Sequence, residues 1–159
     1  PNYTMQRMLN DYIDRFYSKE GNRSKELMAD GYAKAKEIAA WKENVASKWD
    51  AVKVVDMKLS DSLLSSPFNG SAYDATIKLD TAGLGRSLGI ELVVYKNEDG
   101  KVKFSKTVPL NVVDEEGDVI TYQLNEVMKD AGMFKYAFRV YPNNPDLPHR
   151  QDFAFIKWI

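Results

Sequence analysis

The spacing of apolar residues changes near Asp50 and divides the chain into two parts. Before Asp50, large apolar side chains recur at intervals of three and four residues, as they do on one face of a helix. This spacing predicts one helix over Met5–Tyr17, ending near Gly21, and a second helix over Ser24–Lys48. Gly31 is expected to weaken the second helix without breaking it.

After Asp50, apolar and polar residues alternate over short runs separated by turn residues, which is typical of β-strands. Seven strands are predicted, over Ala51–Leu59, Ala72–Asp80, Gly89–Lys96, Lys101–Leu110, Asp118–Leu124, Met133–Tyr141 and Asp152–Ile159. Seven short strands without helical segments between them are the signature of an immunoglobulin-like sandwich. We therefore expect a mainly β fold, in which a seven-stranded immunoglobulin-like β-sandwich (residues 50–159) is preceded by two α-helices (residues 1–49).

A short motif before the sixth predicted strand favours the same fold. Immunoglobulin-like domains often enter their F strand through an Asp-x-Gly-x-Tyr sequence, whose Tyr hydroxyl bonds to upstream backbone. Here the segment reads Asp130-Ala131-Gly132-Met133-Phe134. Phe134 can take the packing role of the Tyr, but it cannot form the hydroxyl bond.

The first predicted helix has an apolar face too wide to be left in water. The residues on this face include Met5, Met8, Leu9, Tyr12, Ile13 and Phe16. An exposed patch of this size often marks a binding surface for a partner. The alternative is that the helix packs on the second helix and the β part of the same chain.

Composition excludes several classes of protein. The chain has 22 basic and 23 acidic residues, so it lacks the basic excess of a nucleic-acid-binding protein. No apolar run approaches the ~20 residues needed to cross a bilayer, and the first residues do not resemble a signal peptide. Cysteine is absent, which excludes disulfides and thiolate metal sites and is consistent with a reducing, cytoplasmic location.

The chain offers few residues for catalysis. His149 is the only histidine, so a metal centre with several histidine ligands is excluded. Thr81–Arg86 contains two glycines but lacks the lysine and serine of a phosphate loop, and it is expected to connect the second and third strands. His149 and Arg150 are expected to form a clasp that bonds backbone at the start of the last strand. We therefore assign no catalytic, cofactor-binding or metal-binding residue.

Aromatic residues are the remaining candidates for a site. Sugar-binding modules on β-sandwiches commonly stack exposed aromatic rings on pyranose faces. The candidates for such stacking are Tyr73, Tyr95, Tyr122, Tyr141 and Trp158. The alternative is that these rings belong to the core or to cross-strand pairs, as most strand aromatics do.

Three segments of the chain together resemble a known family. The first is the predicted helix Met5–Tyr17, and the second is Ala39-Ala40-Trp41-Lys42 followed by Trp49 and Val52. The third is Phe134–Pro142 followed by Asn144–Arg150. In order and spacing, they resemble the C-terminal end of bacterial α-glucan (glycogen/starch) phosphorylases of the short, non-animal type. The resemblance spans nearly the whole chain.

This resemblance implies a non-catalytic C-terminal piece of a glycosyltransferase. The family's enzymes cleave α-1,4-glucans with phosphate to glucose 1-phosphate, and they carry pyridoxal phosphate on a lysine. No position here matches that lysine motif or the phosphate-binding residues, so the cofactor is expected only in the parent enzyme. The β-sandwich would pack on the catalytic body or assemble it, and α-glucan would be a partner only through the parent. The surface for the upstream catalytic domain would be Met5, Met8, Leu9, Tyr12, Ile13 and Phe16.

Two other functions stay open. One is a carbohydrate-binding module for α-glucans, which would use some of the five aromatic candidates. The other is a free-standing interaction or adaptor domain, which would use the apolar face of the first helix to dock a partner. Neither alternative requires nucleic acid or a membrane as a partner.

Overall fold

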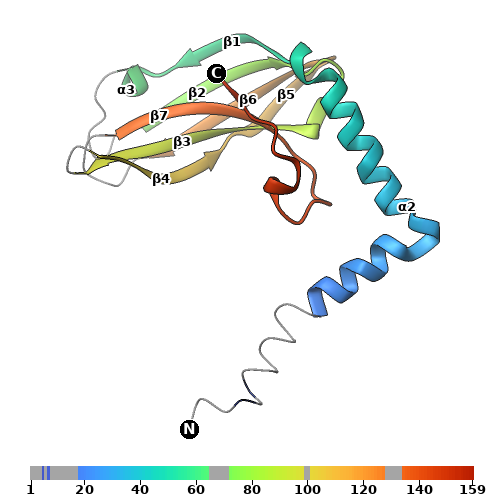
Figure 1. Cartoon of the computed structure of the whole chain (residues 1–159). Coiled ribbons are helices and arrows are strands. Elements are labelled where there is room, and N and C mark those ends of the chain that lie inside the picture. Colours follow the sequence, from blue (N-terminus) through green and yellow to red (C-terminus); the bar gives the residue numbers. More distant parts are fainter. Residues whose placement is uncertain (1–4, 6, 8–17, 65–71, 99–100, 128–133) are drawn as a thin grey trace. The chain divides into compact units, whose positions relative to one another are not determined.

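The protein is described from a computed structural model, which covers residue 5, residue 7 and residues 18–64, 72–98, 101–127 and 134–159. The fold is mainly β, with two antiparallel sheets and one long helical element (Figure 1). The chain divides into two compact units, Pro1–Glu43 and Asn44–Ile159. Among the described residues, no helix is long and apolar enough to span a membrane.

The helical element α2 runs over Ser18–Lys48 and is interrupted in its middle. Residues Asp30, Gly31 and Tyr32 have φ angles of 50°, 65° and 66°, which is the left-handed region. The prediction that Gly31 would leave the helix unbroken is therefore wrong, because a left-handed residue cannot continue a right-handed helix. The predicted stop at Gly21 is also wrong, since the helix continues through it. A glycine costs a helix only about 1 kcal/mol unless its backbone turns left-handed.

Most of the first predicted helix lies outside the described residues. Met5 and Arg7 are helical, and the Met5 side chain is exposed. Met8, Leu9, Tyr12, Ile13 and Phe16 are not described. The proposed role of this face in binding an upstream domain therefore stays a prediction.

The described residues of the second unit contain eight strands, not the seven predicted. They are β1 Lys53–Leu59, β2 Ala72–Asp80, β3 Leu88–Glu98, β4 Lys101–Pro109, β5 Asn111–Glu116, β6 Val119–Val127, β7 Phe134–Pro142 and β8 Lys157–Trp158. The first sheet has the order β1-β2-β6-β5, and the second sheet has the order β4-β3-β7-β8. A short helix, α3 (Asp61–Leu64), follows β1.

The missed strand is β5, which follows β4 after a single residue. Pro109 ends β4 at the edge of the second sheet, and the Leu110 amide bonds the Ile90 carbonyl. The chain then enters the first sheet, where β5 pairs with β6. Gly117 and Asp118 form the turn that joins β5 to β6. The predicted strand ends at Leu110, and the acidic run Asp114–Glu116 makes the residues after it look unlike a strand.

The last predicted strand, Asp152–Ile159, is also wrong for most of its length. Arg150–Phe153 forms a 3₁₀ turn, and only Lys157–Trp158 pairs with β7. The alternation of apolar and polar residues in this segment imitates a strand. Phe153 and Phe155 instead contact each other, with ring centroids 4.8 Å apart.

The core lies between the two sheets (Figure 1). Its buried side chains come mainly from four central strands: Ala75, Ile77 and Leu79 of β2, Ile120, Tyr122 and Leu124 of β6, Leu88, Ile90, Leu92 and Val94 of β3, and Phe138 and Val140 of β7. The Tyr122 hydroxyl crosses this core and donates to the Leu88 carbonyl at 2.9 Å. Burial raises the pKa of Tyr122, so the hydroxyl stays a donor at neutral pH.

The loop between β2 and β3 connects to the turn between β5 and β6. The Thr81 hydroxyl, fully buried, donates to the Asp118 carbonyl at 2.8 Å and accepts from the Gly85 amide. On the surface nearby, Arg86 makes a bidentate pair with Glu115, at 2.8 and 3.2 Å. The predicted loop over Thr81–Arg86 is confirmed as a structural connection.

The outer faces of the two sheets differ. On the first sheet, the outward cross-strand pairs of the two central strands are polar: Asp74–Asn125, Thr76–Gln123 and Lys78–Thr121. The edge strands β1 and β5 expose Val55 and Val113. On the second sheet, β3 has buried residues on both of its faces, because Glu91 and Val93 are as inaccessible as Ile90 and Leu92. A strand covered on both sides lacks the usual alternation. The second sheet therefore has an outer layer that the first sheet lacks.

Candidate functional site

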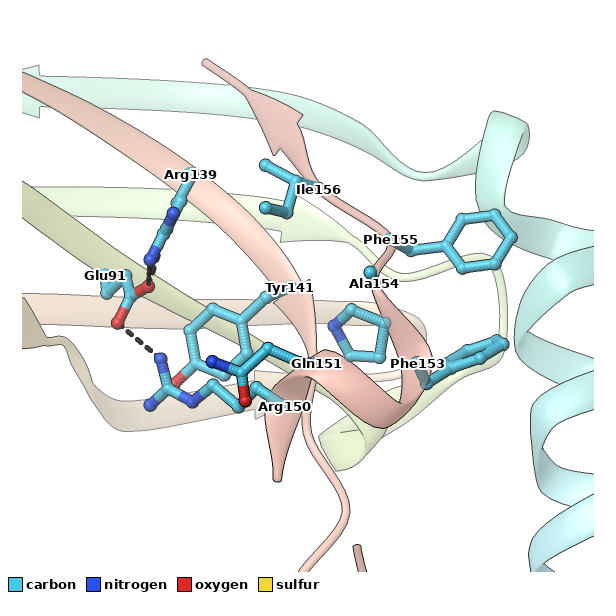
Figure 2. A pocket seen from close by; sticks show the side chains of 10 residues that line it. Glu91, Arg139, Tyr141, Arg150, Gln151, Phe153, Ala154, Phe155 and Ile156 are labelled. Atoms are coloured by element: carbon cyan, nitrogen blue, oxygen red, sulfur yellow. Dashed lines mark hydrogen bonds and ion pairs between the residues drawn. The ribbon is translucent and has the colours of Figure 1, made fainter. Parts of the chain in front are cut away.

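The most unusual group in the described residues is the carboxylate of Glu91 on β3. Its side chain is only 1% exposed and lies on the outer face of the second sheet. Glu91 Oε1 accepts from Arg139 Nε at 2.6 Å, and its Oε2 accepts from Arg150 Nη1 at 2.5 Å (Figure 2). Arg139 is the direct cross-strand partner of Glu91 on β7. A buried carboxylate needs such charged donors, because burying it alone would cost several kcal/mol.

Arg150 reaches Glu91 from the C-terminal segment. Its guanidinium carbon lies 4.0 Å above the centroid of the Tyr141 ring, and its Nη2 contacts the Tyr141 hydroxyl at 3.2 Å. Burial raises the pKa of the Tyr141 phenol, so this hydroxyl stays protonated at neutral pH. Arg150 is thereby held by an ion pair and by a cation–π contact.

The other side of the Tyr141 ring covers Gly89, its cross-strand partner on β3. A Cβ atom at Gly89 would lie 2.7 Å from Tyr141 Cζ, which is closer than real contacts allow. Glycine is therefore needed here for the close approach of the ring. The order from the sheet outward is glycine, tyrosine ring and guanidinium.

Replacing Gly89 by alanine is expected to lower the free energy of unfolding by about 1 to 3 kcal/mol, as overpacking does. The added methyl group would push the Tyr141 ring outward and disturb its contact with Arg150. Urea unfolding of the variant measures this loss. The matched control is Gly21→Ala, since Gly21 has open space around its Cβ position. An unchanged stability of Gly89→Ala would show that Tyr141 moves away at no cost.

A cavity of about 230 Å³ lies beside the Glu91 cluster (Figure 2). Glu91, Arg139, Tyr141 and Arg150 form its polar side. Its apolar side comes from the C-terminal segment, with Phe153, Ala154, Phe155 and Ile156. The charged groups in the wall are already paired with one another, which does not favour acid–base chemistry. The pairs instead hold the C-terminal segment against the second sheet.

The C-terminal segment is also fixed at its end. Lys157 Nζ donates to the Trp49 carbonyl at 2.9 Å and to the Val52 carbonyl at 2.8 Å. The Trp49 ring packs edge-on against Phe155, with centroids 5.3 Å apart. This segment therefore connects the residues just before β1 to the edge of the second sheet.

The predicted clasp is correct in place but wrong in its partners. Arg150 bonds the side chains of Glu91 and Tyr141 rather than backbone. His149 is exposed and precedes the 3₁₀ turn, where its carbonyl accepts from the Asp152 amide. Glu91 was missed altogether, although a charged residue inside the apolar run Gly89–Tyr95 is a signal that sequence reasoning can use.

The five aromatic candidates for sugar stacking fall into two groups. Tyr73 and Tyr122 are buried between the sheets, and the Tyr141 ring is covered by Gly89 and Arg150. Tyr95 and Trp158 both lie on the outer face of the second sheet, where Trp158 is 52% exposed and Tyr95 is half-buried. Arg139 lies over the Trp158 ring, 5.6 Å from its centroid. Sugar stacking stays a prediction, and Tyr95 and Trp158 are the rings that solvent reaches.

Nothing in the described part of the chain gathers metal ligands, since it contains no cluster of three or more His, Cys, Asp or Glu side chains able to hold an ion. The cavity does not fit pyridoxal phosphate either. That cofactor needs a lysine for its Schiff base, and no lysine lines the cavity. Lys157, the nearest lysine in sequence, is bonded to two carbonyls.

Comparison with known proteins gives consistent matches. The family model described as the glycogen phosphorylase C-terminal domain matches residues 49–159. The chain is 27% identical over 166 residues to a maltodextrin phosphorylase of Thermococcus litoralis, with 99% of this chain and 18% of the relative covered. It is 21% identical over 159 residues to a glycogen phosphorylase of Mycobacterium bovis, with 98% of this chain and 18% of that relative covered. The chain thus spans less than a fifth of the length of these relatives.

Proposed function

Because the chain belongs to the glycogen phosphorylase C-terminal domain family, we propose that it is the non-catalytic C-terminal region of an α-glucan phosphorylase. In this proposal its β-sheets pack on the catalytic body or assemble it. The parent reaction would be the phosphorolysis of α-1,4-glucan to glucose 1-phosphate. Other parts of the polypeptide would bind the transferred glycosyl group and the cofactor.

The coverage of the relatives carries this proposal. Both relatives are phosphorylases by name, and each aligns with nearly all of this chain over only 18% of its own length. The described charged cluster also supports it, because Glu91 and its arginines are satisfied by one another and leave no poised acid or base. Pyridoxal phosphate, if the parent enzyme uses it, would be bound by residues outside this chain. A cytoplasmic location is part of the same proposal.

We also infer that the β domain has the immunoglobulin-like topology and begins near residue 50. The orders β1-β2-β6-β5 and β4-β3-β7-β8 correspond to the immunoglobulin orders A-B-E-D and C′-C-F-G. Compared with a seven-stranded immunoglobulin domain, the additional strand is β4 at the C′ position, whereas the strand missing from the sequence prediction is β5. The family match beginning at residue 49 supports the boundary.

An activity assay tests the proposed function. The 159-residue chain, incubated with glycogen, phosphate and pyridoxal phosphate, is expected to release no glucose 1-phosphate. A phosphorylase-length polypeptide that contains this chain should release it under the same conditions. Turnover by the 159-residue chain alone, or none by the longer polypeptide, would contradict the proposal.

The carbohydrate-binding alternative is favoured by the position of Tyr95 and Trp158 on one sheet face. It predicts that maltoheptaose binds the chain and that Trp158→Ala removes most of the binding. Calorimetric titration measures this, with Tyr73→Phe as a control for a buried ring. Absence of heat at millimolar sugar argues against this alternative.

The adaptor alternative depends on the length of the gene. It predicts an open reading frame that encodes only these residues and a partner for the apolar face of the first predicted helix. An open reading frame of phosphorylase length contradicts it. The proposed function requires an open reading frame of phosphorylase length.

A further inference from the structure

We propose that the cavity beside Glu91 is a binding site for a small apolar carboxylate, a molecule with one carboxylate group on a ring or a branched hydrocarbon body. The described residues that line the cavity all belong to the second unit, Asn44–Ile159. The inference goes beyond the proposed function, because it concerns a ligand of this region itself and does not depend on the polypeptide that contains it.

The cavity has a charged side and an apolar side. Figure 2 shows Glu91, Arg139 and Arg150 on one side and residues 153–156 of the C-terminal segment on the other. An apolar lining with a few placed polar groups is the usual composition of a small-molecule site. An apolar cavity of about 150 Å³ already holds a benzene ring. The volume of about 230 Å³ therefore leaves room for a six-membered ring and its carboxylate.

The charged side of the cavity carries an excess positive charge. Among the described residues that line the cavity, Arg139 and Arg150 are the cations and Glu91 is the single acid, so their formal charges give +1. Asp152 belongs to the same segment as Arg150 but does not line the cavity. An excess charge in a site that partly excludes water attracts a counter-ion more strongly than it would in bulk solvent. The charge count thus favours a ligand with one negative charge.

Arg150 is the group best suited to bind the carboxylate. Its side chain is 54% exposed, whereas that of Arg139 is 25% exposed. A guanidinium has five N–H donors, and the described contacts of Arg150 use Nη1 for Glu91 and Nη2 for the Tyr141 hydroxyl. Donors therefore remain for a ligand. The cation–π contact with Tyr141 holds the guanidinium in place before binding, so less side-chain freedom is lost when the ligand arrives.

An apolar carboxylate fits this cavity better than inorganic phosphate or a sugar. Phosphate has no apolar part to place against Phe153 and Phe155, whose rings lie 4.8 Å apart in the apolar side. A sugar would bring hydroxyl groups against the same rings, and a hydroxyl without a hydrogen-bond partner is costly to remove from water. A carboxylate on a hydrocarbon body instead matches both sides, because its charge meets Arg150 and its body replaces water beside the rings.

Titration of the isotope-labelled 159-residue chain with benzoate, followed by nuclear magnetic resonance, tests the site. We expect saturable shifts of the backbone amides of residues 153–156, with a millimolar dissociation constant. The amides of β5, in the first sheet, are the internal reference and should not shift. Acetate has the charge without the ring, and benzyl alcohol has the ring without the charge. Each should bind at least about tenfold more weakly than benzoate, because each lacks one half of the contacts.

A matched pair of substitutions at Ile156 tests the role of charge. Ile156 lines the cavity and is 46% exposed, so both Ile156→Glu and Ile156→Gln should fold, which circular dichroism checks. The two side chains have the same shape. Benzoate should bind Ile156→Glu at least about tenfold more weakly than Ile156→Gln, because like charges repel. Benzyl alcohol should bind both variants equally.

Arg150→Gln tests the proposed anchor. It should lower the affinity for benzoate to that for benzyl alcohol, because the ligand loses its charged partner. Arg86→Gln is the control, since Arg86 is an exposed arginine that is paired with Glu115 away from the cavity. It should leave the affinity for benzoate unchanged.

Several outcomes would overturn this inference. Unchanged spectra at millimolar benzoate would mean that the cavity takes no such ligand. Equal affinity of benzoate for the two Ile156 variants, or full affinity for Arg150→Gln, would place the bound benzoate elsewhere. Inorganic phosphate or maltose that displaces benzoate and binds more tightly would show that the ligand class is wrong. The proposed function stands in each of these cases, because it is tested by the turnover of the longer polypeptide.

Discussion

Replacing Trp49 by alanine is expected to lower the free energy of unfolding of the chain by about 3 to 5 kcal/mol, which is the usual cost of truncating a large buried aromatic. Trp49 is 7% exposed and lies in the 3₁₀ turn between α2 and β1. Its ring packs on Phe155. The substitution removes the surface on which the C-terminal segment rests, in addition to the transfer energy of the ring. Urea unfolding followed by circular dichroism measures the loss.

Trp158→Ala is the matched control for this prediction. Trp158 belongs to the same segment but is 52% exposed, and its described contact is the cation–π pair with Arg139. Its removal should cost about 1 kcal/mol or less. Similar losses for the two variants would show that the segment is not anchored at Trp49. Retention of stability in Trp49→Ala would mean that Phe155 collapses into the space left by the ring.

Much of the fold could be predicted because the strands are locally encoded. Alternation in β2 gave its bounds, Ala72–Asp80, correctly. The failures occur where local patterns agree with more than one structure. The fourth predicted strand stops at Leu110, and the residues after it contain the acidic run Asp114–Glu116, so the strand beyond the change of sheet depends on which strands are neighbours in space. Gly31 is another case, since a helix with a glycine and a helix broken by it have similar sequences.

The site was harder to predict than the fold because its residues meet only through the sheet register. Glu91 and Arg139 are 48 residues apart, and Arg150 comes from a third segment. The run Gly89–Tyr95 nevertheless held two signals. A charged residue within an uninterrupted apolar run indicates a buried charge with partners, and a glycine at its start indicates a close approach. Which residues pair with Glu91 depends on the pairing between strands, and the periodicity of the sequence does not reveal this pairing.

Replacing Glu91 by glutamine is expected to lower the free energy of unfolding by about 3 kcal/mol. The substitution keeps the shape of the side chain and removes its charge, so the guanidinium of Arg139, three-quarters buried, loses its counter-ion. Removing one partner of a buried ion pair costs more free energy than the intact pair contributes, because the remaining charge stays buried without a partner. Arg150 is about half exposed and can turn to water, which limits its share of the loss. Urea unfolding of both proteins at neutral pH gives the difference.

Glu115→Gln is the control, because both carboxylate oxygens of Glu115 also accept from arginine, here from Arg86 alone and at the surface. Exposed pairs of this kind contribute about 1 kcal/mol or less. The contrast compares the loss of charge at a buried carboxylate with the same loss at an exposed one. The double variant Glu91→Met with Arg139→Met should then recover most of the loss, since apolar side chains can replace a buried ion pair. If the double variant is no more stable than Glu91→Gln, the cluster has a role that apolar packing cannot supply, namely holding Arg150 and the C-terminal segment in place.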